Sequence, residues 1–354
     1  MALRLFPEWH PQDAIQLTWP HADSDWAPTL ACIEATLTAM VVAITRYQTV
    51  LIAVADTTTR ERLAHTFSCL GVSGERLRLV VAAADDTWAR DHGPIAVEEN
   101  GRIVLRDFTF TGWGGKFTAE RDNRLSQQLA QQGVFAAPLD ANSLVLEGGA
   151  IESDGQGTLL TTEACLLNPN RNPHLDRRGV EAELAATLGA SRVLWLAHGH
   201  LEGDDTDSHI DTLARFCDPH TIAYVHCDDA QDPHYPALAA MRGELEALRQ
   251  ADGTPYRLVA LPWPQPCFDP DDGHRLPATY ANFLIINGAV LVPTYADAAD
   301  TRALAALAEA FPGRDIVPID CRSVIRQHGS LHCLTMQLPR GSLAAAPHSA
   351  EGTP

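Results

Sequence analysis

The sequence has no uncharged apolar run that reaches the roughly 20 residues needed to span a membrane. Its first residues, Met1 to Glu8, also lack the apolar core of a secretory signal. These two absences argue against a membrane-spanning or secreted protein. We therefore expect a soluble protein of the cytoplasm.

No CxxC pair occurs among the eight cysteines, which are scattered through a chain of 354 residues. This pattern favours reduced thiols in a cytosolic enzyme over a disulfide framework. The cysteines are Cys32, Cys69, Cys165, Cys217, Cys227, Cys267, Cys321 and Cys333.

Positive charge is scarce, because 26 lysines and arginines face 45 aspartates and glutamates, giving a formal net charge of −19. A chain this acidic is a poor candidate for binding nucleic acid or an anionic membrane. It would instead attract a small cationic ligand. With 45% hydrophobic and 20% charged residues, the composition is otherwise that of a globular protein.

The spacing of apolar residues predicts helices that alternate with short strands. The expected helices are residues 29–46, 58–70, 124–132, 181–188, 236–250 and 297–310. The expected strands are 49–54, 77–82, 95–97, 103–107, 144–151, 157–162, 192–196, 221–226, 256–261, 281–286, 289–293, 315–318 and 334–338. Loops are expected at 88–94, 113–116, 202–211 and 262–277, where glycine, proline or acidic residues are dense.

The order of these elements is repetitive. A helix, a strand, a polar loop and a hairpin recur four or five times at intervals of roughly 60–70 residues, which suggests internal structural repeats. We expect one catalytic α/β domain over residues 1–340. From Gly341 onward the composition predicts a disordered tail.

Cys333, in the stretch Gln327 to Thr335, is a candidate catalytic nucleophile. Only a few per cent of a free thiol is ionised at neutral pH, so a reactive cysteine needs a base, a nearby cation, or both. The candidates for these groups lie far upstream, in the blocks Trp88 to Pro94 and Asp204 to Asp211. A buried cysteine that is simply inert is the competing interpretation.

Two pairs in the upstream blocks suit chemistry on a cation. On an extended segment, His209 and Asp211 would point to the same face, where they could combine proton transfer with cation binding. Trp88 and Asp91 could sandwich a planar cation between a ring and a carboxylate. The alternatives are a solvated acidic loop for the first pair and a structural aspartate for the second.

Glu147 and Trp113 each adjoin glycines and could line a cleft or simply pack. Glycines inside the predicted strand 144–151 indicate a close backbone approach or a bulge.

A zinc site is a remote alternative. The stretch His198 to Gly203 begins like the HxHxDH motif of metallo-β-lactamase hydrolases, but Glu202 and Gly203 depart from it. A zinc-dependent hydrolase would use His198, His200 and His209. A binding protein without catalysis is a third hypothesis.

Taken together, these blocks resemble the agmatine deiminase and bacterial peptidylarginine deiminase family, within the guanidine-modifying (pentein) superfamily. The resemblance runs in family order over roughly residues 6–339, and so many motifs in series are specific. The matching stretches are Pro7 to Trp9, Thr18 to Pro20, Trp88 to Pro94, Trp113 to Lys116, Leu146 to Ile151, Leu159 to Asn168, Asn170 to Pro173, Asp205 to Asp211, Tyr280 to Phe283 and Leu331 to Thr335.

The resemblance implies an α/β propeller of five ββαβ modules around a central cleft. It also implies roles for individual residues. These are Cys333 as nucleophile, His209 as general acid and base, Asp91 and Asp211 as the grip on a guanidinium, Trp88 as a stacking ring, and Asp205, Glu147 and Trp113 as further contacts to the substrate or to catalytic groups.

The implied reaction is guanidine hydrolysis without a metal or organic cofactor. The thiolate attacks the guanidinium carbon, ammonia leaves, and water releases a ureido product from a covalent thiouronium on Cys333. With agmatine the product is N-carbamoylputrescine, a step of putrescine biosynthesis. The expected partner is this small cationic substrate, with no nucleic acid and no membrane. A homodimer is the assembly that we consider.

Three departures from the family pattern lie near the site. The usual Gly-Gly-Gly-Asn-Ile-His-Cys is here residues 327–333, Gln-His-Gly-Ser-Leu-His-Cys, and the usual Asp-Gly-His contains Ser208. The usual Gly-Gly-Ser-Ile-His is here residues 148–152, Gly-Gly-Ala-Ile-Glu. These changes concern the walls that would recognise the far end of the substrate. Agmatine is therefore the expected substrate, and peptidyl-arginine or another small guanidine is the alternative.

Overall fold

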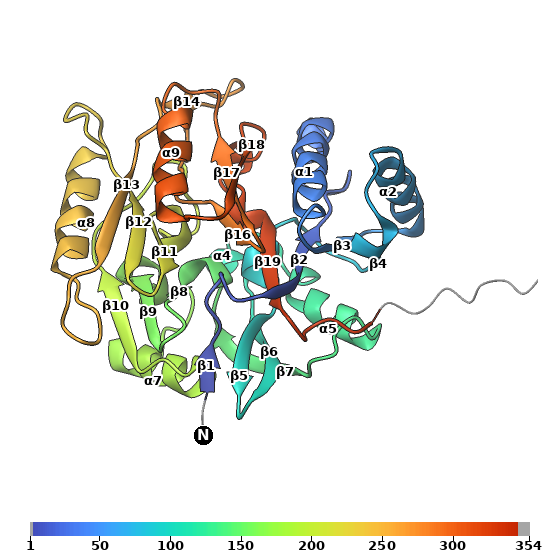
Figure 1. The fold of residues 1–354 in the computed structure, drawn as a ribbon, viewed down its shortest axis with the longest axis horizontal. Helices are drawn as coiled ribbons and strands as arrows, with labels where there is room; N and C mark the ends of the chain where they lie inside the picture. Colours follow the sequence, from blue (N-terminus) through green and yellow to red (C-terminus); the bar gives the residue numbers. More distant parts are fainter. Residues whose placement is uncertain (1–2, 346–354) are drawn as a thin grey trace, which may run out of the picture.

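The computed structural model describes residues 3–345. It is a mixed α/β fold, in which most helices lie around the outside of several small sheets (Figure 1). Part of the predicted tail makes contacts: the carbonyl of Ser342 accepts a 2.8 Å hydrogen bond from the amide of Ala136, and Leu343 pairs with Phe135. The rest of that prediction, residues 346–354, lies outside the described residues.

The first sheet joins both ends of the described chain. Strand β2 (Gln12–Thr18) pairs antiparallel with β19 (Thr335–Pro339) and parallel with β3 (Thr49–Val54), and β4 (Leu77–Val81) completes the sheet. Figure 1 shows the blue strand β2 beside the red strand β19. This pairing brings residues close to Cys333 into contact with the N-terminal segment. The connecting helices are α1 (Leu30–Ile44) and α2 (Thr57–Cys69).

A second sheet has the strand order β1-β5-β6-β7. Its central strands, β5 and β6, form an antiparallel hairpin. Strands β6 and β7 pair in parallel, and a helix connects them along the chain. The elements are β1 (Leu3–Leu5), β5 (Ile95–Glu99), β6 (Arg102–Thr109), α5 (Leu125–Gln131) and β7 (Leu139–Val145).

Three further sheets repeat one plan: an antiparallel strand pair, a helix, and a third strand parallel to the second. The first contains β8 (Glu152–Ser153), β9 (Thr158–Thr162), α6 (Glu163–Leu166), α7 (Arg177–Leu188) and β10 (Arg192–Leu196). The second contains β11 (Ala214–Asp218), β12 (Thr221–Val225), α8 (Tyr235–Ala247) and β13 (Arg257–Leu261). The third contains β16 (Leu284–Ile286), β17 (Ala289–Thr294), α9 (Asp300–Ala310) and β18 (Asp315–Asp320).

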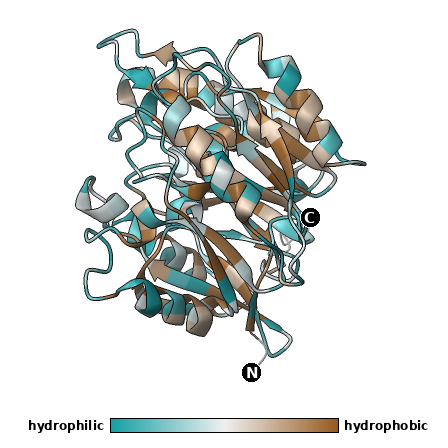
Figure 2. Ribbon diagram, turned by 90° about the vertical axis from the view of Figure 1, so that its left-hand side faces the viewer, coloured by the Kyte–Doolittle hydropathy of each residue, from teal (hydrophilic) through white to brown (hydrophobic). Residues whose placement is uncertain are grey.

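The core forms where the helices cover these sheets. In α1, Ile33, Leu37 and Met40 recur at helical spacing and are fully buried. Figure 2 shows hydrophobic residues gathered on the strands, whereas the helices carry both hydrophobic and hydrophilic residues. Burial of each such side chain contributes about 1.5–3 kcal/mol.

The segment Ala27–Ile44, which includes α1, is long and apolar enough to cross a membrane by length and composition alone. In the structure, one side of α1 packs into the core of the fold. The core helix of a soluble protein passes the same test, so the segment is weak support for a membrane span.

Several predicted elements need correction. Residues 88–94 were expected to form a loop, but the chain makes one helical turn there, α3 (Ala89–His92). The predicted strand 144–151 ends at Val145 as β7, and a 3-10 turn at Gly148–Ala150 separates β7 from β8. The glycines therefore lie in a connection between two sheets and not inside a strand.

Other short elements were missed. Strand β11 was not predicted, because its five residues include a buried arginine, Arg215. The long proline-rich loop contains the two-residue strands β14 (Cys267–Phe268) and β15 (Arg275–Leu276). The turn after β6 is α4 (Gly112–Gly115), in which all four residues have positive φ.

Candidate active site

A pocket brings together residues from all three sequence blocks. Five of the predicted site residues line it, namely Trp88, Asp91, Trp113, Asp205 and Cys333. The other three, His209, Asp211 and Glu147, are fully buried and absent from the lining. The remaining lining residues are Asp25, Asp86, Phe117, Thr206, Gln327, His328 and Gly329.

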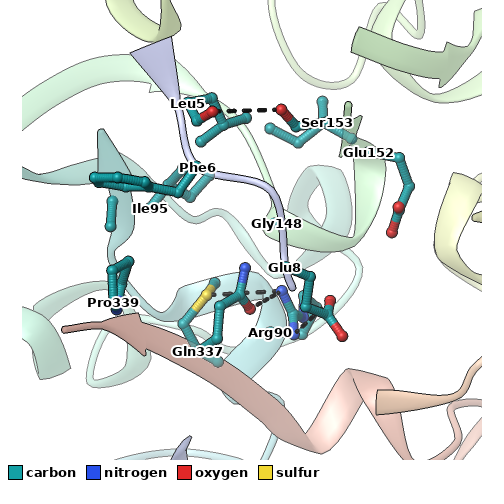
Figure 3. A pocket seen from close by; sticks show the side chains of 13 residues that line it. Leu5, Phe6, Glu8, Arg90, Ile95, Gly148, Glu152, Ser153, Gln337 and Pro339 are labelled. Atoms are coloured by element: carbon teal, nitrogen blue, oxygen red, sulfur yellow. Dashed lines mark hydrogen bonds and ion pairs between the residues drawn. The ribbon is translucent and has the colours of Figure 1, made fainter. Parts of the chain in front are cut away.

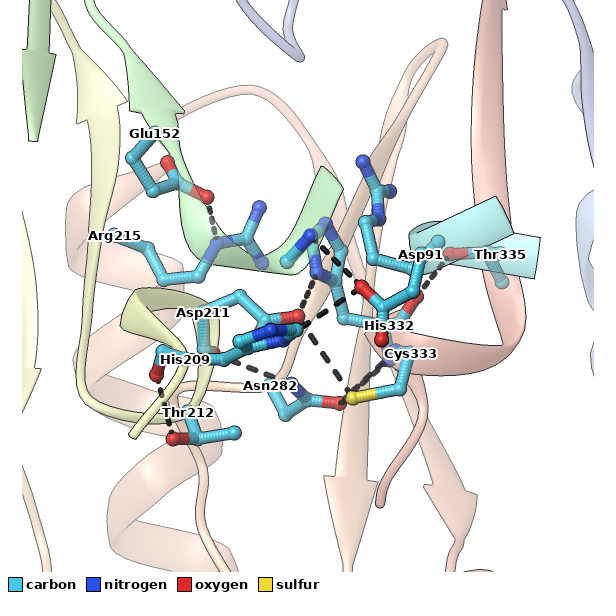
Figure 4. A network of polar contacts seen from close by, with 12 residues as sticks. Asp91, Glu152, His209, Asp211, Thr212, Arg215, Asn282, His332, Cys333 and Thr335 are labelled. Atoms are coloured by element: carbon cyan, nitrogen blue, oxygen red, sulfur yellow. Dashed lines mark hydrogen bonds and ion pairs between the residues drawn. The ribbon is translucent and has the colours of Figure 1, made fainter. Parts of the chain in front are cut away.

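Cys333 is 4% exposed and sits in a 3-10 turn, His332–Leu334, directly before β19. Its Sγ lies 3.4 Å from Oδ1 of Asn282 and 3.8 Å from Oδ2 of Asp211 (Figure 4). Burial, and then the carboxylates of Asp211 and Asp91, raise the pKa of the Cys333 thiol well above its usual range. In the free protein this cysteine is therefore a thiol, and a bound cation would favour the thiolate.

Asp91 is held in a fixed orientation. Its Oδ2 accepts a 2.9 Å hydrogen bond from Nε1 of Trp113, and its Oδ1 accepts one of 2.9 Å from the amide of Gly149. Burial raises the pKa of Asp91, while the nearby His209 lowers it. The single turn α3 places this carboxylate beside the pocket.

The backbone of Trp113 is strained into the left-handed region, with φ of 55°. Thr111 stabilises the turn, because its Oγ1 accepts a hydrogen bond from the amide of Gly114. Close packing also requires a glycine at 114, where a Cβ would lie 2.4 Å from Nδ2 of Asn170. The turn thereby holds the indole of Trp113 toward Asp91.

His209 is fully buried between two carboxylates. Its Nδ1 lies 3.6 Å from Oδ1 of Asp91, and its Nε2 lies 3.9 Å from Oε2 of Glu147. Burial opposes a charge on the ring, but Asp91, Cys165 and Glu147 together raise the pKa of His209 to about 10. Burial also raises the pKa of Cys165, so we attribute the charge on His209 to the two carboxylates.

The loop before His209 is built from side-chain hydrogen bonds. Asp204 accepts hydrogen bonds from the amides of Thr206 and Ser208, at 3.1 and 2.7 Å. Asp207 and Ser208 both adopt left-handed backbone angles, with φ of 66° and 65°. The strain at Ser208 coincides with the position where the family pattern has glycine.

Glu147 contacts an arginine and lies behind the pocket surface. Nε of Arg171 lies 2.9 Å from Oε2 and 3.1 Å from Oε1 of Glu147, and both side chains are fully buried. Nη1 of Arg171 also donates to Asp207 at 2.7 Å. Lys116, the only lysine of the chain, donates to Asp207 from the other side at 2.8 Å. These ion pairs connect the blocks around Glu147 and His209.

Gly149 has no room for a side chain. A Cβ there would lie 2.6 Å from Nδ1 of His209, 2.8 Å from Oδ1 of Asp91 and 3.2 Å from Oδ2 of Asp211. The prediction of a close backbone approach at this glycine pair is confirmed. Because Gly149 has no side chain, the side chains of His209, Asp91 and Asp211 can lie close together around its Cα.

The outer part of the pocket is aromatic and acidic. Gly329 lies against the ring of Trp88, where a Cβ would be 2.3 Å from the nearest ring atom. Nε1 of Trp88 donates to Asp86 at 2.9 Å. Burial raises the pKa of Asp205 to about 6, and His328 acts in the opposite direction.

Sequence reasoning assigned no role to two neighbours of Cys333. Oδ1 of Asn282 accepts hydrogen bonds from the amides of His332 and Cys333 at 2.8 and 3.3 Å, which fixes the nucleophile turn. Nδ1 of His332 lies 2.8 Å from Oδ2 of Asp211. Both residues lie in stretches that match the family. This was the only feature of the sequence that could have indicated a role for them.

The zinc alternative does not correspond to a cluster in residues 3–345. His198 is exposed and pairs with Glu244, and the ring of His200 lies beside that of His234. Two buried groups do have possible ligand atoms within 4.8 Å of one another: Glu147, Cys165 and His209, and Glu8, Glu152 and His332. Arginines already pair with the carboxylates of both groups, which disfavours an added cation.

Comparisons with known proteins agree with this geometry. The sequence model of the Porphyromonas-type peptidyl-arginine deiminase family matches residues 4–339. The agmatine deiminase of Stutzerimonas stutzeri is 34% identical over 355 residues, which cover 94% of each chain.

Solved structures give the same relationship. A candidate arginine deiminase from Porphyromonas gingivalis is 48% identical with a TM-score of 0.89, covering 97% of this chain and 100% of that one. A cysteine-to-serine variant of the C. jejuni agmatine deiminase with substrate bound is 37% identical with a TM-score of 0.89, covering 96% and 97% of the two chains. An amidinotransferase from Microseira wollei, at 13% identity and a TM-score of 0.53, shares the fold alone. This chain therefore belongs to the Porphyromonas-type peptidyl-arginine deiminase family.

Proposed function

We propose that this protein is an agmatine deiminase, a hydrolase that converts agmatine and water into N-carbamoylputrescine and ammonia. The lining of the pocket carries the proposal. Among the described residues it contains Cys333 and four aspartates, Asp25, Asp86, Asp91 and Asp205, with no lysine or arginine. Agmatine is cationic at both ends, so it complements these carboxylates. The α-carboxylate of free arginine would be repelled by them.

The first step is the binding of the guanidinium by Asp91 and Asp211. The cation offsets the two carboxylates that oppose ionisation of Cys333, so the pKa of the thiol falls when substrate binds. The thiolate then attacks the guanidinium carbon, and an S–C bond forms as the C–N double bond opens. Asn282, 3.4 Å from Sγ, keeps the sulfur in place for this attack.

His209 supplies and then removes a proton. Its pKa of about 10 means that the ring carries a proton before reaction, which it donates to the leaving nitrogen. Ammonia departs as the C–N bond breaks, leaving a thiouronium on Cys333. The neutral ring then takes a proton from water as the water oxygen attacks. The C–S bond then breaks as the C=O bond of the ureido product forms, the remaining hydroxyl proton passes to solvent, and Cys333 is left as the thiolate.

Three finer points belong to the same proposal. Five of the six sheets within residues 3–345, all except the β14-β15 pair, would be the blades of an α/β propeller around the site. We place the enzyme in the cytoplasm, where its free cysteines would stay reduced. Light scattering on the purified protein would distinguish a monomer from the homodimer that we considered.

The decisive experiment is product formation from agmatine, free arginine and an arginine peptide, with Cys333→Ser as the control. We expect ammonia and N-carbamoylputrescine from agmatine, and neither from the variant. Turnover of the peptide in place of agmatine would favour a peptidyl-arginine deiminase, the second candidate, which the matching family description supports. If the wild-type protein leaves agmatine intact, or if Cys333→Ser turns it over as the wild type does, the proposed function is wrong.

A further inference from the structure

His332 lies between two carboxylates on the side of Asp211 away from the pocket. Its Nδ1 is 2.8 Å from Oδ2 of Asp211, and its Nε2 is 2.6 Å from Oε2 of Glu8 (Figure 4 shows the Asp211 side). A neutral imidazole carries one N–H and could donate to only one of these oxygens. The geometry is that of an imidazolium donating to both.

Two N–H donors point at Glu8, which favours its ionised form and leaves the proton shared with His332 on the ring. Its Oε1 accepts from the amide of Ile285 at 2.7 Å, and its Oε2 accepts from Nη2 of Arg215 at 2.6 Å. Nη2 of Arg90 lies 3.6 Å from the same Oε2, beside a small cavity (Figure 3). Burial raises the pKa of Glu8, but Arg215 and then His332 outweigh it and lower that pKa.

The charge balance of the buried cluster agrees with a protonated His332. Burial raises the pKa of Glu152, but this carboxylate accepts from Arg215 and from the amide of Phe216, which favour its ionised form. With all three carboxylates ionised, they face three cations only if the His332 ring is charged. A neutral ring would leave one uncompensated negative charge in the interior, which is costly. The cluster consists of Glu8, Glu152, Asp211, Arg90, Arg215 and His332, all at most 7% exposed.

The consequence concerns the carboxylate that would hold the substrate. Oδ2 of Asp211 is taken by His332, whereas Oδ1 is buried and has no hydrogen-bond partner within residues 3–345. Besides His332, the charged or titratable groups that face Asp211 are Asp91, His209, Arg90, Arg215 and the Cys333 thiol. A buried carboxylate oxygen without a partner is suited to accept from a guanidinium, and the other oxygen of Asp211 lies 3.8 Å from Sγ of Cys333.

We propose that His332 is a positioning residue of this site: held as an imidazolium by Glu8, it keeps Asp211 ionised and fixes the plane of its carboxylate. The inference rests on the proposed guanidine chemistry, because Asp211 matters only if a cation binds there. It assigns to Glu8, more than 300 residues from Cys333 in sequence, a part in substrate binding.

The first test needs no substrate. Nitrogen NMR of protein labelled with ¹⁵N-histidine reports whether each ring nitrogen carries a proton. We expect both nitrogens of His332 to be protonated at neutral pH, with the signal assigned by its loss in His332→Gln or its shift in Glu8→Gln. A His332 ring with one bare nitrogen at neutral pH would overturn the proposal.

The second test measures agmatine binding against pH in a Cys333→Ala background, which cannot turn over. Adding His332→Gln should raise the Kd for agmatine at least about tenfold, because buried Asp211 then binds a proton. The acidic limb of the binding curve, the pH below which binding is lost, should also move up by about one pH unit or more. Glu8→Gln should act in the same direction. Unchanged Kd and an unchanged acidic limb in a folded His332→Gln chain would contradict the proposal.

The matched control is His234→Gln. His234 is a buried histidine whose Nδ1 lies 2.7 Å from Asp232, outside the site, so its replacement should leave the acidic limb in place. If His332→Gln does not fold by circular dichroism, Glu8→Gln and the NMR measurement still decide. If the Cys333→Ala protein binds no agmatine at any pH, the proposed substrate is wrong, and the NMR result alone judges His332.

Discussion

The indole N–H of Trp113 is hydrogen-bonded to Asp91 at 2.9 Å, and it comes from a residue whose backbone is held at a φ of 55°. Left-handed backbone is unfavourable for a bulky side chain, so the surrounding structure must maintain it. The contact leaves Asp91 only a narrow range of orientations beside the pocket. Strain in one residue is thereby coupled to the orientation of another.

Trp113→Phe should keep most of the ring packing and remove the donor. We expect kcat/KM for agmatine to fall about 10- to 100-fold, because one hydrogen bond to a buried carboxylate contributes roughly 1.5–3 kcal/mol. Steady-state kinetics with thermal unfolding as the fold check would measure this. A variant with wild-type kinetics would show that the indole N–H is dispensable.

Asp91→Asn should abolish turnover while the protein stays folded. The amide cannot carry the negative charge that holds a guanidinium, and it can accept from only one of Trp113 and Gly149 while its NH₂ group faces the other. Removing one of several buried carboxylates also relieves repulsion, so the loss of stability should be small. Loss of the folded state would instead identify Asp91 as a structural residue.

Gly149→Ala should be inactive. Its Cβ would need to occupy space 2.6 Å from Nδ1 of His209, so the base or Asp91 must move. A displacement of this size at a reacting centre reduces rates by about 100-fold or more. The matched control is Gly74→Ala, since Gly74 has no atom within 4 Å of a built Cβ and should tolerate the change. Equal activities in the two variants would contradict the prediction that a Cβ at position 149 displaces His209 or Asp91.

Asp205 should give agmatine binding a pH dependence. Its pKa of about 6 means that the carboxylate is charged above this pH and attracts an ammonium, and that the attraction is lost as pH falls through about 6. The KM for agmatine should therefore rise on acidification in the wild type. Asp205→Asn should show a high KM throughout, without that change. An alkylguanidine that lacks the distal ammonium, tested in parallel, should not report this group.

His328→Gly tests the role of a strained wall residue. His328 has φ of 68°, its Nδ1 donates to the carbonyl of Gly203 at 2.7 Å, and its ring stacks on His274. Glycine relieves about 1–2 kcal/mol of strain and loses contacts of similar size, so the melting temperature should change little. The KM for agmatine should change while kcat stays within a few-fold. A large drop in stability with unchanged KM would mean that the ring only supports the fold.

Much of the secondary structure could be predicted from apolar spacing. The strands predicted at 49–54 and 192–196 have those bounds in β3 and β10, because continuous apolar runs flanked by polar residues form buried parallel strands. Prediction failed at residues 144–151, where apolar residues continue past Val145 although the chain turns at Gly148–Ala150. Apolar character records burial, and a buried turn resembles a buried strand in this respect.

The sequence by itself also determined the chemical groups of the candidate site. Cysteine, histidine and aspartate stood in blocks that match one family, and the structure brings Cys333 within 3.8 Å of Asp211 and His209 within 3.6 Å of Asp91. The roles of these four residues stay predictions until the variants are measured. What the blocks could not reveal was which groups lie behind the site.

Only the tertiary structure decided those partners. Glu147 contacts Arg171, and His332 links Asp211 to Glu8, a residue in the segment between the first two strands. Such pairs depend on where several sheets converge, because a buried charge must find its counterion across elements that are distant in sequence. Local patterns specify which residues form helices and strands, whereas the ionisation of a buried site depends on contacts that exist only after the chain has folded.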